Sequence, residues 1–207
     1  MDKPMNRWKR IYRKLFRQKD RIGEYEALLK RALENGYRVM SLLEWVREDY
    51  PSGHVLLLRH DVDTDSRGAE RMFEVERHLG VHASYYFRHL TMKSSLVKRM
   101  LREGFEVGLH YETLAVKMRH LQLKDKKEIS SEILLSCQQQ LAGEIQEFRK
   151  SFGSMTSLCS HGAAWNRKLG VPNHILVDDT FKKEHDILFE AYDEALRERI
   201  TTYISDA

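Results

Sequence analysis

The sequence predicts an α/β fold of mostly parallel strands, arranged either as an open sheet or as a closed barrel. Two observations support this: short apolar segments alternate with segments of helical periodicity, and the loops between them are only a few residues long. The chain has 207 residues, of which 42% are hydrophobic, which is enough for one main domain with a sizeable core. No internal repeat contradicts this architecture.

The predicted domain begins with two helices and two strands. Helical periodicity over 24–35 ends at Gly36, and 37–40 is expected to be a short strand. A short helix is expected over 42–49, before a turn of proline, serine and glycine. The strand at 55–59 follows, and its aliphatic run is typical of a strand buried on both faces.

The alternation continues through the rest of the chain. Helices are expected at 66–79 and 94–102, each followed by a glycine, with an aromatic-rich strand at 83–88 between them. The next strand, 105–109, precedes the longest predicted helix, 124–148. Further short strands are expected at 157–159, 175–177 and 201–205.

A basic segment, predicted at 1–23, precedes the main domain at 24–207. The formal charge of the chain is only +4, but nine lysines and arginines fall within the first 21 residues. We expect a solvated helix that docks on the domain through its apolar side, and no nucleic-acid site; weak contact with an anionic membrane surface stays open. The residues expected to dock are Trp8, Ile11, Tyr12, Leu15 and Phe16.

The sequence also predicts where the protein works. No stretch approaches the roughly 20 apolar residues of a membrane-spanning helix, and the N-terminus lacks the apolar core of a secretory signal. The two cysteines, Cys137 and Cys159, are far apart, so we expect buried thiols and no disulfide framework or zinc finger. A cytoplasmic protein fits these features best.

The end of the strand at 55–59 is the most informative part of the chain, because an apolar run meets Asp61 and Asp63 there. In an extended backbone, residues two apart point to the same side. Two carboxylates held together repel each other unless a cation or a shared proton relieves them. This pattern predicts a divalent metal ion or a catalytic carboxylate pair.

Polar side chains follow two more predicted strands. His110 and Glu112 come after 105–109, and His161 comes after 157–159. Because the carboxyl ends of parallel strands meet at one edge of a sheet, we expect these groups to converge with the two aspartates. Mixed carboxylate and imidazole ligands suit zinc, manganese, iron, cobalt or nickel better than calcium.

Neighbouring polar residues have simpler explanations. Asp65 or Ser66 is expected to cap the following helix. His60 points away from Asp61 in an extended strand, so we expect it to be packed or to support a ligand. Glu112 either orients a ligand or caps a turn.

The order of these motifs is similar to that of the polysaccharide deacetylase family, the NodB-like carbohydrate esterases, in a divergent branch with Arg-His-Asp-Val-Asp. The similarity covers about residues 25–207 and rests on 58–63, 87–88, 106–112 and 160–162. It implies a distorted barrel of parallel strands and helices, and metal-dependent removal of N- or O-acetyl groups from sugars. By position, it implies Asp61 as general base, and Asp63 and His110 as metal ligands. From the residues themselves, Tyr85, Tyr86 and Phe87 are expected to fill the core, and Arg88 after them to face the pocket.

The chain departs from the family pattern in three places. Val62 separates two aspartates that are adjacent in the family. Leu114 stands where the family has a second imidazole, so His161, or less readily Glu112, has to complete the coordination. The family's late histidine, its general acid, has no match here; since 203–206 resembles the start of another strand end, we expect a shortened chain or missing last strands.

Three functions are therefore compared. The first is a metal-dependent deacetylase, with zinc or else cobalt, nickel or manganese, acting on a sugar or sugar-nucleotide precursor in surface polysaccharide synthesis. The second is a non-catalytic carbohydrate-binding or scaffold protein with a degenerate deacetylase fold, suggested by the missing imidazole and late acid. The third is a phosphohydrolase of the HD type, suggested by His60-Asp61; in that class the pair lies on a helix, whereas 55–58 looks like a strand.

Overall fold

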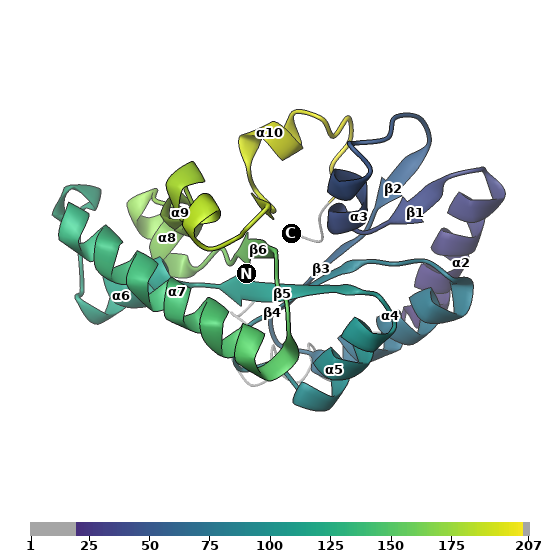
Figure 1. The fold of residues 1–207 in the computed structure, drawn as a ribbon, viewed down its shortest axis with the longest axis horizontal. Helices are drawn as coiled ribbons and strands as arrows, with labels where there is room; N and C mark the ends of the chain where they lie inside the picture. The colour runs from purple at the N-terminus through teal and green to yellow at the C-terminus, as the bar shows by residue number, and fades with distance from the viewer. Residues whose placement is uncertain (1–19, 205–207) are drawn as a thin grey trace, which may run out of the picture.

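The computed structural model describes residues 20–204, and their strands pair in parallel (Figure 1). The main sheet has five strands in chain order: β3 (Arg59–Val62), β4 (Ser84–Phe87), β5 (Glu106–Tyr111), β6 (Ser157–Ser160) and β7 (Phe189–Glu190). A smaller sheet pairs β1 (Arg38–Met40) with β2 (Val55–Leu57). The predicted α/β class with parallel strands is confirmed.

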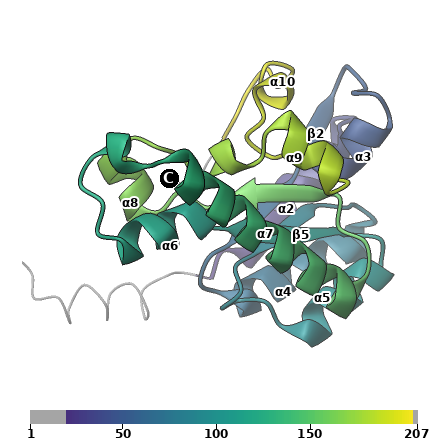
Figure 2. The ribbon, with the colours of Figure 1, turned by 60° about the vertical axis from the view of Figure 1, so that its left-hand side comes forward.

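Helices connect the strands. They are α2 (Ile22–Glu34), α3 (Leu42–Arg47), α4 (Ser66–Leu79), α5 (Ser94–Arg102), α6 (Thr113–His120), α7 (Ser131–Phe152), α8 (Ala164–Leu169), α9 (Asp179–Glu184) and α10 (Glu194–Arg197), with 3-10 turns η1 (Lys126–Glu128) and η2 (Asn173–Leu176). Figures 1 and 2 show α4, α5 and α7 along one side of the main sheet, and α6 and α8 beyond the carboxyl ends of its strands. Cavities at those carboxyl ends are where α/β folds bind their ligands.

The main sheet divides its side chains between two cores by strict alternation. Tyr85 and Phe87 of β4 belong to the larger core, together with apolar side chains of α4, α5 and α7. Tyr86, between them, points to the opposite face and packs with Trp45 of α3 and Cys159 of β6. All three aromatic residues of β4 are fully buried, as their predicted core role requires.

Buried Glu106 holds α3 against this second face of the sheet. Its carboxylate accepts hydrogen bonds from the Ser84 hydroxyl (2.5 Å), the Tyr86 hydroxyl (2.6 Å) and the Ser157 hydroxyl (2.5 Å). It also accepts one from the backbone N–H of Leu43 (2.8 Å), in the first turn of α3. A carboxylate with this many donors is adequately solvated by the protein, and its charge favours the N-terminal end of the helix.

The segment 55–62, predicted as a single strand over 55–59, forms two consecutive strands, one in each sheet. Its first half is β2 and its second half is β3, and Leu58 lies between them. The Leu58 N–H donates to Met40 of β1 (3.0 Å), whereas its carbonyl accepts from Ser84 of β4 (2.9 Å). The prediction that this strand is buried on both faces is wrong, since most of its residues are only half-buried, in contrast to β4, β5 and β6.

The longest helix begins later than predicted. It was expected at 124–148 but is α7, Ser131–Phe152, preceded by the 3-10 turn η1. Two capping residues explain the difference: the Asp125 side chain accepts from Lys127 N–H (2.8 Å), and Ser130 accepts from Ile133 N–H (3.3 Å). Each side chain satisfies helix-start donors, so the chain restarts at Ser130.

Two predicted strands are absent from the described part of the chain. The apolar run at 175–177 lies largely in η2, and residues 201–204 form no strand. The sequence patterns also missed β7, which is only two residues long, and the helix α6, which follows β5 directly. Short elements carry too few residues for a clear periodicity.

Three further predictions concern the basic N-terminal segment, membrane-spanning helices and the two cysteines. The basic segment at 1–23 lies outside the described residues except for 20–23, where α2 begins at Ile22. Within 20–204, no helix is both long and apolar enough to cross a membrane. Cys137 and Cys159 are both free and buried, as predicted.

Gly108, on β5 below the candidate site, supplies a test of this packing. A Cβ there would lie 2.7 Å from the Ser157 carbonyl oxygen and 2.9 Å from the Tyr86 ring. We expect Gly108→Ala to lower the free energy of unfolding by about 1–3 kcal/mol, measured by urea denaturation, because backbone and ring must both shift.

Gly143→Ala in α7 is the matched control. A Cβ at this helical position meets nothing within 4 Å, so the substitution should be neutral or stabilise the protein by up to about 1 kcal/mol. Equal destabilisation by the two substitutions would contradict the close approach at Gly108.

Candidate metal centre

The structure brings Asp63, His110 and His161 together at the carboxyl ends of the strands. Asp63 follows β3, His110 lies near the end of β5, and His161 follows β6. Their alternation with residues of the larger core places all three on the second face of the sheet. The convergence expected from the sequence is therefore present for these three residues, whereas Glu112, which was expected to join them, belongs to neither possible ligand group.

The distances among the three ligand atoms fit a single ion. Asp63 Oδ1 lies 3.1 Å from His161 Nδ1 and 3.4 Å from His110 Nε2, and the two imidazole nitrogens are 3.2 Å apart. An ion about 2.0–2.2 Å from each donor, as zinc requires, needs donors about 2.8–3.6 Å apart in octahedral or tetrahedral geometry. The three side chains could hold a divalent cation with little movement.

Asp63 Oδ1 shows the chemistry of this cluster most clearly. The oxygen is buried and receives no hydrogen bond, although two ring nitrogens lie close to it. A buried carboxylate oxygen without a donor is costly unless something positive satisfies it. The donor set of one oxygen and two nitrogens fits zinc, cobalt, nickel or manganese.

His110 is held in the tautomer and protonation state that a metal ligand requires. Its Nδ1 lies 3.1 Å from the Cys159 carbonyl oxygen, so Nδ1–H donates there and the lone pair of Nε2 faces Asp63 and His161. Burial lowers the pKa of His110, which favours the neutral imidazole. Neutral histidine is the form that binds metals.

The loop that carries His161 is fixed by buried asparagines. Asn173 Nδ2 donates to the His161 carbonyl (2.5 Å) and to Asn166 Oδ1 (3.0 Å), and Asn173 Oδ1 accepts from the Ala115 N–H (2.9 Å). The His161 N–H donates to the Tyr111 carbonyl (2.8 Å), which continues the pairing of β5 with β6 beyond the strand. These bonds hold His161 opposite His110.

Asp61 lies on the same face as Asp63 but has different partners. Arg59 Nη2 donates to Asp61 Oδ2 (3.1 Å), and the Cys159 thiol donates to Asp61 Oδ1 (3.4 Å). The same Arg59 nitrogen also donates to the hydroxyls of Tyr192 (2.9 Å) and Tyr203 (2.8 Å), and its guanidinium stacks over both rings. The arginine therefore fixes the Asp61 carboxylate beside the three-residue cluster.

Asp61, His110 and Cys159 form a second group that could hold an ion. This group is less suited to a cation, because a guanidinium already neutralises Asp61. Burial, followed by the charge of Asp61, also raises the pKa of the Cys159 thiol well above its ordinary value, which disfavours the thiolate that binds metals. We therefore favour the group formed by Asp63, His110 and His161.

The remaining predicted residues lie around this centre. Asp65 caps α4, since its side chain accepts from Arg67 N–H (3.0 Å). His60 points to the opposite face, as predicted, where its Nε2 contacts Glu76 Oε1 (2.6 Å) and the Tyr25 hydroxyl. Glu112 occupies the N-cap position of α6, but its side chain makes no cap hydrogen bond there.

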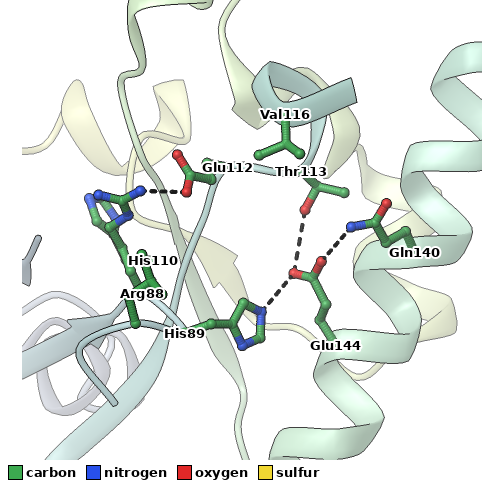
Figure 3. A pocket seen from close by; sticks show the side chains of 9 residues that line it. Arg88, His89, His110, Glu112, Thr113, Val116, Gln140 and Glu144 are labelled. Atoms are coloured by element: carbon green, nitrogen blue, oxygen red, sulfur yellow. Dashed lines mark hydrogen bonds and ion pairs between the residues drawn. The ribbon is translucent and has the colours of Figure 1, made fainter. Parts of the chain in front are cut away.

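Glu112 instead pairs with Arg88 at the edge of a pocket of about 140 Å³ (Figure 3). Arg88 Nη2 donates to Glu112 Oε1 (2.5 Å), and Arg88 Nε is buried without a hydrogen-bond partner. His110 also lines this pocket, together with His89, Leu90, Thr113, Val116, Gln140 and Glu144. A ligand in the pocket would reach the metal cluster through His110.

Sequence reasoning missed several residues of this region. Arg59 and Cys159 share the alternation of Asp61 and His161, so the same two-residue period could have identified them. Tyr192 and Tyr203 lie more than 130 residues beyond Arg59 and gave no local signal. Neither did Glu190, a fully buried carboxyl group that accepts hydrogen bonds from the N–H groups of Ser160 and Tyr192 (both 2.6 Å).

The two overlapping ligand groups can be separated by substitution. We expect His161→Gln to abolish stoichiometric zinc binding, measured by calorimetry, and Cys159→Ser to retain it, because only His161 belongs to the favoured group. Loss of zinc from Cys159→Ser with retention in His161→Gln would reverse the assignment.

Glu190 gives the protein a pH-dependent stability. Burial raises the pKa of Glu190 to about 7, so the folded state favours the neutral acid and loses stability as pH rises from about 4.5 through 7. Glu190→Gln cannot ionise; the wild-type free energy of unfolding, relative to that of this variant, should therefore fall between pH 5 and pH 8 in urea titrations. A difference that stays constant with pH would contradict the assignment.

The centre thus combines three side chains that could hold a cation, an adjacent carboxylate fixed by arginine, and a small pocket lined by both polar and apolar groups. With a divalent ion bound, such a constellation would place an electrophile for a carbonyl group beside a carboxylate base. No family model, curated protein or solved structure matches the chain significantly.

Proposed function

We propose that the protein is a metal-dependent hydrolase that removes an acetyl group from a sugar or a sugar-linked precursor. The observation that carries the proposal is the cluster of Asp63, His110 and His161, whose ligand atoms lie 3.1–3.4 Å apart. Asp61 lies beside it on the same strand face, within ligand distance of His110. Metal-dependent hydrolysis of an amide or ester uses this pairing of an electrophilic centre with a base.

Each residue has a distinct part in this proposal. Asp63, His110 and His161 hold the divalent ion, which we propose to be zinc and which, when bound, supplies a Lewis acid for the acetyl carbonyl. Asp61 takes a proton from the attacking water, and Arg59 keeps its carboxylate in position. Arg88 and Glu112 line the adjoining pocket and are available to position the sugar.

The resemblance to polysaccharide deacetylases supports the proposal. The two aspartates separated by Val62 both lie within ligand distance of His110: Asp61 is in β3, and Asp63 is in the bend directly after it, where its N–H donates to the Asp61 carbonyl (3.2 Å). Leu114 is fully buried in α6, and His161 supplies the second imidazole from another loop. We further propose that the two sheets, joined through Leu58, form the distorted barrel of that family.

A non-catalytic carbohydrate-binding protein is the second candidate. One observation favours it: both oxygens of Asp61 already accept hydrogen bonds, from Arg59 and from Cys159.

The HD-type phosphohydrolase is not supported, because His60 lies in strand β3 and not in a helix. A pocket of about 140 Å³ favours a single sugar unit, free or on a carrier, over a polymer segment buried along its length.

Metal binding and catalysis can be tested separately. Protein purified without chelator should contain about one zinc per chain by elemental analysis, and Asp63→Asn should lose it, since the buried oxygen would be replaced or weakened as a ligand. His78→Gln, an exposed histidine at the end of α4, is the control and should keep the ion. Wild-type protein that contains no metal would count against the hydrolase.

Asp61→Asn distinguishes the two candidate functions. In the hydrolase this variant should keep zinc and lose acetate release from an N-acetyl sugar by about 10²-fold or more, because the base is gone. In the binding protein, glycan affinity should survive both Asp61→Asn and removal of the metal, and wild-type protein should release no acetate.

A further inference from the structure

We propose that His89, held by Glu144, is the general acid that protonates the leaving group of the reaction. This inference rests on the proposed hydrolase function and adds a second proton-transfer residue to it. Two imidazoles line the pocket, those of His89 and His110, and His110 is committed to the metal cluster. His89 is therefore the imidazole that can exchange a proton with a ligand in the pocket.

The chemistry of the reaction requires such a residue. Water attacks the acetyl carbon while Asp61 takes its proton, and the C–N or C–O bond to the sugar then breaks. The electron pair of that bond goes to the leaving nitrogen or oxygen, which must receive a proton, because an amide anion or alkoxide is a poor leaving group. The products are acetate and a free amine or alcohol; Asp61 then releases its proton to solvent, and His89 regains a proton from solvent.

The geometry around His89 is that of an oriented acid (Figure 3). His89 Nε2 lies 3.3 Å from Glu144 Oε2 on α7, across the pocket. Glu144 is itself fixed: Gln140 Nε2 donates to its Oε1 (2.9 Å), and the Thr113 hydroxyl donates to its Oε2 (3.4 Å). A carboxylate that orients an imidazole, and is oriented in turn, is the arrangement by which enzymes position proton-transfer histidines.

The surrounding charges favour the protonated ring. The hydrogen bond with Glu144 raises the pKa of His89, and the charge of Glu112 at the start of α6 acts in the same direction. Arg88, its neighbour in sequence, is neutralised by Glu112, and His110 of β5 is the other titratable group lining the pocket. The imidazolium carries a proton on each nitrogen, so one N–H stays with Glu144 while the other is available for transfer. The ring is 61% exposed, which gives it room to reach a bound ligand.

Dependence on the leaving group provides the test. Zinc-loaded full-length wild type, His89→Gln and the control His120→Gln, an exposed histidine of α6, would be assayed with an N-acetyl amino sugar and with 4-nitrophenyl acetate. We expect His89→Gln to lower amide turnover by about 10²-fold or more, and to leave the ester within about twofold, because nitrophenolate departs without a proton. His120→Gln should resemble wild type, and His89→Gln should retain its zinc.

The pH dependence gives a second readout. Since the acid must be protonated, wild-type amide turnover should fall as pH rises through the pKa of His89, and His89→Gln should lack this limb. Glu144→Gln removes the charge that stabilises the imidazolium, so the limb should move to lower pH. The pKa of His89, followed by NMR in the metal-free protein, should fall in the same variant, which is a measurement independent of activity.

The outcomes separate this inference from the proposed function. If wild type hydrolyses both substrates and His89→Gln hydrolyses the amide equally well, His89 is not the acid and the hydrolase stands. If His89→Gln loses both substrates to the same extent, the residue has a structural role and the inference is overturned. If wild type hydrolyses neither substrate, the proposed function fails and this inference fails with it.

Discussion

The parallel, in-register pairing of β3 to β6 is the constraint on which the candidate site depends. Pairing aligns Asp61 with Tyr86 and Tyr86 with Gly108, and it places His110 opposite Cys159. A slip of one residue in the pairing of any strand would turn the side chains that face the candidate site toward the larger apolar core. The buried aromatic residues on one face therefore set the positions of the charged residues on the other.

The two aspartates of β3 and its following turn illustrate how environment separates similar groups. Asp61 is neutralised by Arg59, which two tyrosines hold in place, whereas the buried oxygen of Asp63 faces only ring nitrogens. A cation is thus attracted to the Asp63 carboxylate, whereas the guanidinium of Arg59 repels a cation from Asp61. This asymmetry favours Asp63 over Asp61 as a cation ligand, and in the proposed hydrolase it assigns proton transfer to Asp61.

Sequence alone predicted the parts of this arrangement that follow from local pattern. The apolar strands, their polar ends and the alternation along β3 led to Asp61, Asp63, His110 and His161. The contacts of Arg59 with distant tyrosines, and of His89 with Glu144, depend on how loops return to the sheet, which no local periodicity encodes. Short elements such as β7 and η2 were missed or misassigned because tertiary packing, and not propensity, decides their conformation.

The single strand shared by the two sheets links distant parts of the molecule. Separation of β1 from β2 would disturb the backbone at Leu58, and with it the segment that delivers both aspartates. Any ion captured at the strand ends would then stabilise the amino-terminal layer as well, by thermodynamic linkage. Substitutions that weaken the pairing of β1 with β2 would accordingly lower ion affinity from a distance, without touching a ligand.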